Sequence, residues 1–259
     1  MGRRRRMKLI DVVKNFVKAT PLVYLWAYYK KKSGWPRSQS NEAEIIARLA
    51  NTYAIPKVFI EFGFGAWEFN CARLIDDWQG LLIDGDGRNV ALARKVLPAN
   101  MTCKHLWLDL NNLDVIEAYA ATRDIGILSI DVDGNDYWFL RSLISIKPAM
   151  IICEYNSSFG MRSISVPYEQ SFRRFKKHAS GLYFGASLAA LKNLCDRNGY
   201  RLVETSENGV NAFFVRGDLL DPGSVPLDLA NVFREKKLKD GSSQPQQWST
   251  IMDLEFVEV

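Results

Sequence analysis

The stretch KVFIEFGFG, residues 57–65, decides the fold. Val58 to Ile60 form an apolar run that predicts a buried strand, which leads through the acidic Glu61 into a glycine-rich turn. Apolar residues at helical spacing then predict a helix over 66–78. In α/β proteins, a strand followed by glycines and a helix holds a nucleotide-like ligand beyond the carboxyl ends of parallel strands.

Strands and helices alternate through the rest of the chain. Strands are predicted at 57–61, 80–84, near 102–106, 125–130 and 149–153, and helices at 66–78, 88–97, within 112–121, at 136–145 and at 186–198. Two further strands, 200–205 and 210–216, are joined by a turn at 206–209. Alternation implies an α/β fold with a mostly parallel, Rossmann-like sheet covered by helices on both faces, and the closing hairpin adds an antiparallel strand.

Charge divides the chain unevenly. Residues 1–40 contain eleven Lys/Arg and one acid, so they carry +10, and because the whole chain carries +5 the remainder carries −5. An acidic body argues against a nucleic-acid groove across the folded domain. We divide the chain into a basic helical extension with a linker (1–40), a domain (41–217) that begins with a helix whose Asn41 and Glu44 have capping-box spacing, and a tail of unknown course (218–259).

The extension has an amphipathic, aromatic-rich character. Residues 7–19 place apolar side chains on one helical face, and basic residues flank the apolar run 22–29. This pattern fits a helix that lies on an anionic membrane surface, and it fits equally a helix packed on the domain or on a partner subunit. No apolar run approaches the ~20 residues needed to span a bilayer, and no signal peptide is evident, so we expect a cytoplasmic protein.

The glycine turn distinguishes two ligand classes. A nicotinamide-type G-x-G-x-x-G fingerprint that starts at Gly63 would need a third glycine where the chain has Glu68. Glu61-x-Gly63-x-Gly65 instead resembles the first motif of class I S-adenosylmethionine-dependent methyltransferases, although Trp67 replaces the third glycine common in that family. The resemblance implies a seven-stranded sheet whose last strand is antiparallel, and it assigns Glu61, Gly63 and Gly65 to cofactor binding.

Two more aspartates follow strand ends. Asp84 closes the second strand, where a carboxylate can accept hydrogen bonds from both ribose hydroxyls of a nucleoside; the alternative is a turn or helix cap in the sequel Gly85-Asp86-Gly87. Asp109 is similar in position to the methyltransferase residue that contacts adenine, and it could equally cap the next helix.

The fourth and fifth strands both end in acids. Asp131 and Asp133 follow one strand, and Glu154 and Asn156 follow the next, so they should meet at one edge of the sheet. Neighbouring carboxylates repel unless something positive lies between them, such as Mg²⁺, the sulfonium of a cofactor or a basic side chain. We therefore add Asp131 to the cofactor-binding residues.

These two segments resemble those of FkbM-type and related sugar O-methyltransferases. The resemblance covers about residues 55–217 and implies an acceptor that is a sugar or a glycolipid or polysaccharide intermediate. Some macrolide-sugar methyltransferases bind magnesium here, which implies Asp131, Glu154 and Asn156 as metal ligands. Those enzymes have paired acids where this chain has Glu154-Tyr155-Asn156, so solvated acids and helix caps are the alternative.

A sugar hydroxyl must lose a proton during methylation. Asp131 and Asp133 are the first candidates for the base, and His178 is another because it lies in the irregular stretch 156–183 that should cover the substrate side of the pocket. Arginines of this cover, among them Arg173 and Arg174, could bind an anionic substrate.

The sequence thus predicts an S-adenosylmethionine-dependent methyltransferase that acts on an oxygen of a sugar or glycolipid. Methylation of a small natural product and a non-catalytic binding module on the same fold are the alternatives. Magnesium, the oligomeric state and contact with a membrane surface are left open.

Overall fold

The computed structural model describes residue 20 and residues 22–259 of the chain. The predicted helix at 7–19 lies outside the described residues. The helices are α2 (Leu22–Lys32), α3 (Glu42–Thr52), α4 (Gly87–Val96), α5 (Asp114–Ala120), α6 (Asp136–Leu143), α7 (Arg174–Lys177), α8 (Leu188–Arg197), α9 (Leu229–Val232) and α10 (Gln244–Ser249), with 3₁₀ turns at Ala72–Leu74, Ile144–Ile146, Ser157–Phe159 and Gly217–Leu219. The strands are β1 (Val58–Phe62), β2 (Gln79–Asp84), β3 (Met101–His105), β4 (Ile127–Ile130), β5 (Met150–Glu154), β6 (Ile164–Ser165), β7 (Tyr200–Thr205), β8 (Asn211–Arg216) and β9 (Val257–Glu258).

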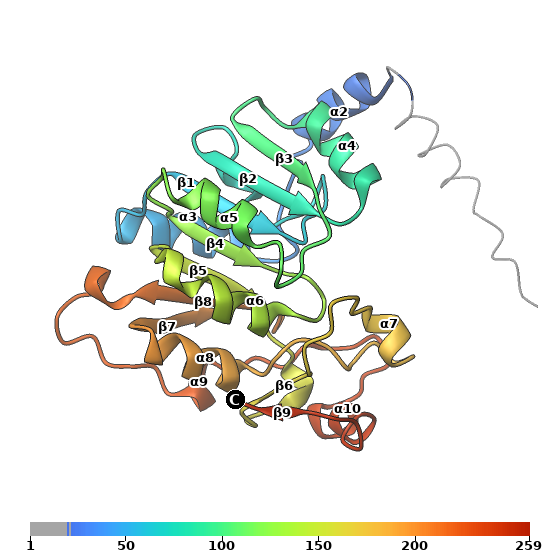
Figure 1. Ribbon diagram of the computed structural model, residues 1–259, viewed down its shortest axis with the longest axis vertical. Coiled ribbons are helices and arrows are strands. Elements are labelled where there is room, and N and C mark those ends of the chain that lie inside the picture. The colour runs from blue at the N-terminus through green and yellow to red at the C-terminus, as the bar shows by residue number, and fades with distance from the viewer. Residues whose placement is uncertain (1–19, 21) are drawn as a thin grey trace, which may run out of the picture.

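Seven strands form one sheet in the order β3-β2-β1-β4-β5-β8-β7 (Figure 1). The pairs β1–β2, β2–β3, β1–β4 and β4–β5 are parallel, whereas β8 is antiparallel to both β5 and β7. This confirms the predicted Rossmann-like, mostly parallel sheet of seven strands with an antiparallel last strand. The order reverses between β1 and β4, which opens a crevice at the carboxyl ends of the strands.

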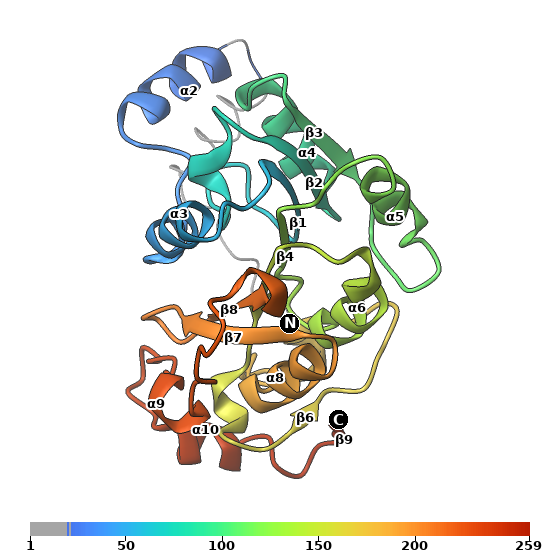
Figure 2. The same cartoon turned by 90° about the vertical axis from the view of Figure 1, so that its left-hand side faces the viewer.

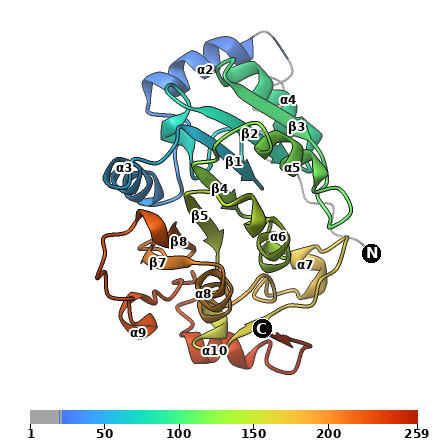
Figure 3. The ribbon, with the colours of Figure 1, turned by 60° about the vertical axis from the view of Figure 1, so that its left-hand side comes forward.

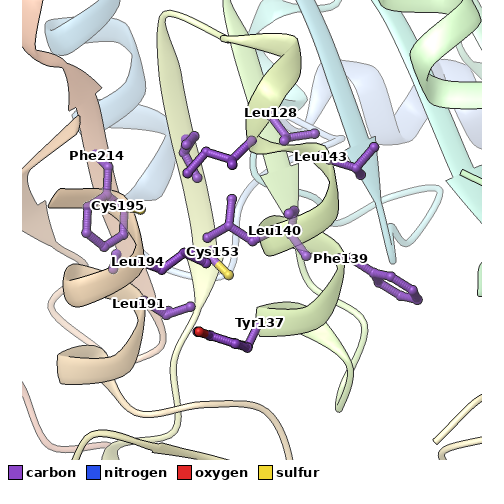
Figure 4. Close-up of a cluster of buried hydrophobic side chains, with 14 of the residues drawn as sticks. Leu128, Tyr137, Phe139, Leu140, Leu143, Cys153, Leu191, Leu194, Cys195 and Phe214 are labelled. Carbon is purple, nitrogen blue, oxygen red and sulfur yellow. The ribbon is translucent and has the colours of Figure 1, made fainter. Parts of the chain in front are cut away.

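Helices cover both faces of this sheet (Figure 3). One core gathers α2, α3 and α4 against the sheet, and the other gathers α5, α6 and α8. Strand residues alternate between the two, so that Ile127 joins the first core and Leu128 the second. In Figure 4, Leu140 and Leu143 of α6 and Leu191 and Leu194 of α8 belong to this second core.

The prediction of a helix over 66–78 is wrong. The backbone of Arg37 donates to the Trp67 carbonyl and accepts from the Phe69 amide, both at 3.1 Å, so this part of the segment lies extended against the linker. The Glu61 carboxylate then accepts the amides of Asn70 and Cys71, and only the 3₁₀ turn Ala72–Leu74 follows. The tertiary partners satisfy the backbone donors that a helix would have satisfied.

The predicted capping box before α3 is also wrong. Asn41 makes no side-chain cap, and its oxygen accepts from the Glu207 amide at 3.1 Å instead. This bond joins the start of α3 to the hairpin turn between β7 and β8, and a cross-chain contact of this kind leaves no local pattern in the sequence.

The tail, whose course the sequence left unknown, packs on the cover. Strand β9 pairs antiparallel with β6 of the cover, and Ile251 and Phe256 of the tail pack with Phe159 and Tyr183 in a third hydrophobic cluster. Figure 2 shows α10, β6 and β9 gathered at the β7–β8 end of the molecule. Among the described residues, no helix is long and apolar enough to cross a bilayer.

Candidate active site

A cavity of about 710 Å³ lies at the carboxyl ends of the strands. Its inner wall consists of the residues that end β1, β2, β4 and β5, among them Gly63, Asp84, Asp131 and Glu154. The cover contributes residues 172–176 to the outer wall, and the tail contributes Lys236. Several residues that were assigned to the site from the sequence therefore line one cavity. Lys236 of the tail, which the sequence did not indicate, lines it too.

Gly63 lines the inner wall where the ends of β1 and β4 approach each other. Its φ is +81°, and a Cβ atom built on it would lie 1.4 Å from the carbonyl oxygen of Asp131. A side chain here would therefore collide with the backbone that follows β4. The glycine allows the β1 and β4 ends to meet, which sets the floor of the cavity.

Glu61 holds the loop that follows β1. Its side chain is buried, and its two oxygens accept from the amides of Asn70 at 2.7 Å and Cys71 at 2.9 Å. Burial raises the pKa of Glu61 to about 7, against the lowering effect of these two bonds. The carboxylate borders the cavity, but its hydrogen bonds serve the loop, so it shapes the wall at Gly63 and Gly65.

Asp84 and Asp86 differ in their surroundings. Asp86 caps α4 by accepting from the Arg88 amide at 2.9 Å, and its carboxylate also pairs with the Arg88 guanidinium. Asp84 lines the cavity, accepts from the Asp86 amide at 2.7 Å, and has a raised pKa, mainly because it is partly buried. Asp84 also bonds to the side chain of Asn89, and because it is not paired with Arg88 it is the carboxylate of the two that is better placed for a ligand.

Asp109 is not among the residues that line the cavity. Its oxygens accept from the Asn111 amide at 2.7 Å and from the side chain of Gln170 at 2.7 Å, and the second bond ties the β3–α5 loop to the cover. On this side Leu106, Trp107 and Leu108 line the cavity, and the indole of Trp107 donates to the Gln170 carbonyl at 3.0 Å. An aromatic side chain directly after a strand was a signal that the sequence interpretation missed.

Asp131 and Glu154 form an acid pair in which Glu154 is buried and Asp131 is partly exposed. Burial and the charges of Asp136 and Asp133 raise the pKa of Asp131 to about 8, while a hydrogen bond with Glu154 lowers it. Burial and the charge of Asp131 raise the pKa of Glu154 well above its ordinary value. Because both groups are acceptors when ionised, they can bond to each other only when one proton lies between them.

One oxygen of Glu154 lacks a partner. Its side chain is about 5% exposed, and no donor among the described residues reaches Oε2. Its Oε1 lies 4.0 Å from Nη1 of Arg174 and 3.9 Å from Nζ of Lys236. A buried oxygen without a donor is costly unless a ligand or a shared proton satisfies it. Glu154 is therefore where the cavity offers a hydrogen-bond acceptor to a bound molecule.

Asp133 lines the cavity but is exposed and already paired. Its φ is +56°, and its Oδ1 accepts from Nη1 of Arg174 at 2.6 Å. The sequence prediction placed it beside Asp131 as a second candidate base. The structure gives it an ion pair with the cover, which holds Arg174 over the strand ends.

Asp136 is a buried acid that the sequence interpretation missed. It accepts from the amides of Val132 at 2.9 Å and Gly134 at 2.9 Å, so it shapes the loop that carries Asp131 and Asp133. Its pKa is raised to about 6, mainly by burial. An aspartate at the first turn of α6, directly after this loop, was the available signal.

Two predicted site residues have structural roles. Asn156 donates to the carbonyls of Leu182 at 2.7 Å and Phe184 at 2.9 Å and accepts from the Ser158 amide, so it ties β5 to the cover. His178 is not among the residues that line the cavity, and its ring bonds to Ser180 at 2.7 Å. The structure thus supports neither Asn156 as a metal ligand nor His178 as the base.

The magnesium prediction gains no support from the geometry. In the part of the chain that the structure describes, no three His, Cys, Asp or Glu side chains are grouped so that they could hold a metal ion. Asp131 and Glu154 come together. The side chain of Asn156, the predicted third ligand, instead donates to the backbone carbonyls of Leu182 and Phe184.

Lys236 reaches the site because the tail is clamped to β5. The hydroxyl of Tyr155 donates to the Arg234 carbonyl at 2.8 Å, and the Lys236 amide donates to the Ser157 hydroxyl at 2.9 Å. The Lys236 carbonyl accepts from the side chain of Gln247 at 3.2 Å. The first two of these contacts join residues 79 positions apart, so no local sequence pattern could have found Lys236.

No protein-family model matches the chain, and no curated protein sequence matches it. Among solved structures, a putative caffeoyl-CoA O-methyltransferase from Staphylococcus aureus aligns with a TM-score of 0.47 at 12% identity, covering 81% of this chain and 97% of that one. An O-methyltransferase from Bacillus cereus in complex with S-adenosylhomocysteine aligns at 0.44 and 10% identity over 78% of this chain and 95% of that one. The N-terminal domain of EvdMO1 with S-adenosylhomocysteine bound aligns at 0.42 and 13% identity over 67% and 79%.

Proposed function

We propose that the chain is an S-adenosylmethionine-dependent methyltransferase that transfers a methyl group to a hydroxyl oxygen. One observation carries this proposal. A single cavity at the carboxyl ends of a methyltransferase-type sheet joins Gly63 and Asp84 on one side to Asp131 and Glu154 on the other. The first pair suits a nucleoside and the second suits a proton transfer.

The residues of the inner wall fit this cofactor. When bound, S-adenosylmethionine supplies an activated methyl group on a positively charged sulfur. Asp84 at the end of β2 would accept hydrogen bonds from its ribose hydroxyls, and the backbone beside Gly63 would border its methionine part. The carboxylates that crowd the β4 and β5 ends gain a favourable charge partner in a bound cation.

The acid pair would take the proton of the acceptor. Glu154 Oε2 can accept a hydrogen bond from an acceptor hydroxyl, and the proton would pass to the Asp131–Glu154 pair as the hydroxyl oxygen takes the methyl group from the sulfur, which would leave S-adenosylhomocysteine. Holding the hydroxyl in line with the methyl group supplies the rest of the catalysis. Magnesium bound at Asp131 and Glu154 stays a proposal, which an assay with added Mg²⁺ and with EDTA tests.

A sugar or a glycolipid intermediate remains the proposed acceptor. The cavity wall beside Glu154 is polar and charged, which suits a molecule with several hydroxyl groups. Methylation of an apolar aromatic natural product, and of no sugar, in an acceptor screen would contradict the sugar proposal.

Cofactor binding is measured by calorimetric titration of the protein with S-adenosylhomocysteine. We expect saturable binding that weakens by about tenfold or more in Asp84→Ala, because each hydrogen bond to a charged group contributes about 1.5–3 kcal/mol. Asp253→Ala, which removes an exposed aspartate outside the cavity, is the matched control. If the wild type does not bind the ligand, the chain is a binding module on this fold and the enzyme proposal fails.

We also propose that α2 contacts the anionic inner face of a membrane. Val23 is fully buried and Trp26 packs edge-on against Trp67 with ring centroids 5.0 Å apart, which fixes the helix on the domain. Leu22 and Leu25 on another face are 50% and 55% exposed. Figure 1 shows this helix beside α4 at the β3 edge of the sheet. The +10 charge of residues 1–40 complements an anionic lipid surface.

Co-sedimentation with lipid vesicles tests this contact. We expect the full chain to bind vesicles that contain phosphatidylglycerol, to bind phosphatidylcholine vesicles weakly, and to lose binding at high salt. Leu25→Glu should weaken binding several-fold, whereas Met252→Glu, a change at a residue that is 51% exposed on the tail, should not. Equal binding to neutral and anionic vesicles, or equal effects of the two substitutions, would refute the proposal.

A further inference from the structure

The charges around the cavity are segregated. The acids come from the strand ends and their adjoining loops, whereas all four cations that line the cavity come from the cover and the tail: Arg173, Arg174, Lys176 and Lys236. An inner wall of acids suits a cationic cofactor. The outer wall, formed by the cover and the tail, is positively charged.

Two of the four cationic side chains, Arg174 and Lys236, lie close to carboxylates of the protein. Arg174 is only 16% exposed and pairs with Asp133, its Nε donates to the Gly181 carbonyl at 2.6 Å, and its guanidinium lies 3.5 Å from the centroid of the Phe184 ring. Lys236 lies beside Glu154 and is held by the clamp of the tail on β5. Their charges are already partly balanced by the acids of the strand ends.

Arg173 and Lys176 differ from these two in their surroundings. Among the described residues, neither has a carboxylate within 4.0 Å. The Arg173 guanidinium lies 3.5 Å from the centroid of the Trp107 ring, and Trp107 is itself fixed by its bond to the Gln170 carbonyl. A guanidinium that contacts an aromatic ring can still use its N–H groups for a bidentate contact with phosphate or carboxylate.

A second observation points to a bound molecule in the same cavity. Glu154 is buried, lines the cavity, and has an oxygen that no donor of the described protein reaches. Either a hydroxyl group of a bound molecule or a proton shared with Asp131 would satisfy this oxygen. The cavity therefore offers an acceptor for a hydroxyl at its floor and two free cations at its rim.

We propose that the acceptor substrate is a hydroxyl compound that carries a phosphate or a carboxylate, with the anionic group bound by Arg173 and Lys176 and the reacting hydroxyl bound by Glu154. This inference rests on the proposed function for the identity of the reaction. The anion site itself does not depend on that function, because its two cations are arranged by the cover and Trp107.

The test uses inorganic pyrophosphate as the probe, titrated calorimetrically into the full chain with and without saturating S-adenosylhomocysteine. We expect binding that weakens at least tenfold in the double variant Arg173→Met, Lys176→Met. The control double variant Lys237→Met, Lys239→Met removes the same charge from exposed tail positions outside the cavity lining and should bind like the wild type. Glu154→Gln should also keep pyrophosphate binding, because the anion contacts other residues.

Two results would overturn the proposal: no pyrophosphate binding by the wild type, or an equal loss in the two double variants, which would indicate non-specific attraction. The S-adenosylhomocysteine titration separates the two ideas. If this ligand fails to bind while pyrophosphate binds through Arg173 and Lys176, the methyltransferase proposal fails and the anion site stands.

Discussion

Replacing Gly63 with alanine is expected to lower the free energy of unfolding by about 2–5 kcal/mol and to abolish cofactor binding. A left-handed backbone costs a residue with a side chain roughly 1–2 kcal/mol, and forcing a methyl group into a packed site adds about 1–3 kcal/mol. Here the new Cβ would lie 1.4 Å from a backbone oxygen, which cannot rotate away as a side chain can. Small domains are stable by only about 5–15 kcal/mol, so the variant should unfold at much lower urea concentration.

Gly199 provides the matched control for this experiment. Its φ of +82° is nearly that of Gly63, but a Cβ built on it would meet nothing within 4 Å. Gly199→Ala should therefore lose only the backbone term of about 1–2 kcal/mol. Equal stabilities for the two variants, with S-adenosylhomocysteine binding intact in Gly63→Ala, would show that the β1 and β4 ends are not in the close contact described.

Glu154→Gln is expected to slow methyl transfer by a factor of about 10²–10⁴, the range for losing a general base. The substitution keeps the shape of the side chain and removes its ability to accept a proton. Binding of S-adenosylhomocysteine should change by less than a few-fold, because Glu154 lies on the acceptor side of the cavity. The measurement is the rate of S-adenosylhomocysteine release with an acceptor that the wild type methylates.

His178→Gln is the control for this variant, since His178 does not line the cavity. It should retain the wild-type rate. A large loss of rate in His178→Gln, together with full activity in Glu154→Gln, would indicate that His178 is the base, as the sequence suggested.

The pH dependence of the wild-type rate follows from the acid pair. Because the pKa of Asp131 is raised to about 8, the ionised form that accepts a proton becomes more abundant as the pH rises through that value. The rate should therefore increase as the pH rises through about 8, and because the pKa of Glu154 is also raised the increase has the same sign for both members of the pair. A rate that is constant between pH 6 and 9 would argue against this pair as the base.

Local patterns were sufficient for the regular elements. The apolar runs at β1, β2 and β4 and the alternation of strands with helices predicted the sheet, and the hairpin of β7 and β8 predicted its antiparallel strand. The segment 66–78 failed because its apolar spacing is helical, but Arg37 and Glu61 take up its backbone amides. Helical spacing records which residues can be buried together, and it carries no information about competing partners for the backbone.

The candidate site was predicted in part. Gly63, Asp84, Asp131 and Glu154 do line one cavity, because acids and glycines at the ends of parallel strands must share an edge. Asp109, Asn156 and His178 do not take the expected places, since each follows a strand or lies in the cover as predicted but turns its side chain to a neighbouring loop.

The sequence by itself determined the fold class and the edge of the sheet where a ligand would bind, because both depend on residues that are neighbours along the chain. Only the tertiary structure decided which acids share a proton, which arginine is free, and that Lys236 completes the wall. These features arise from contacts between segments that lie tens of residues apart, such as Tyr155 with Arg234 and Trp107 with Arg173. Such contacts depend on how the cover and the tail pack together, and no local periodicity encodes that packing.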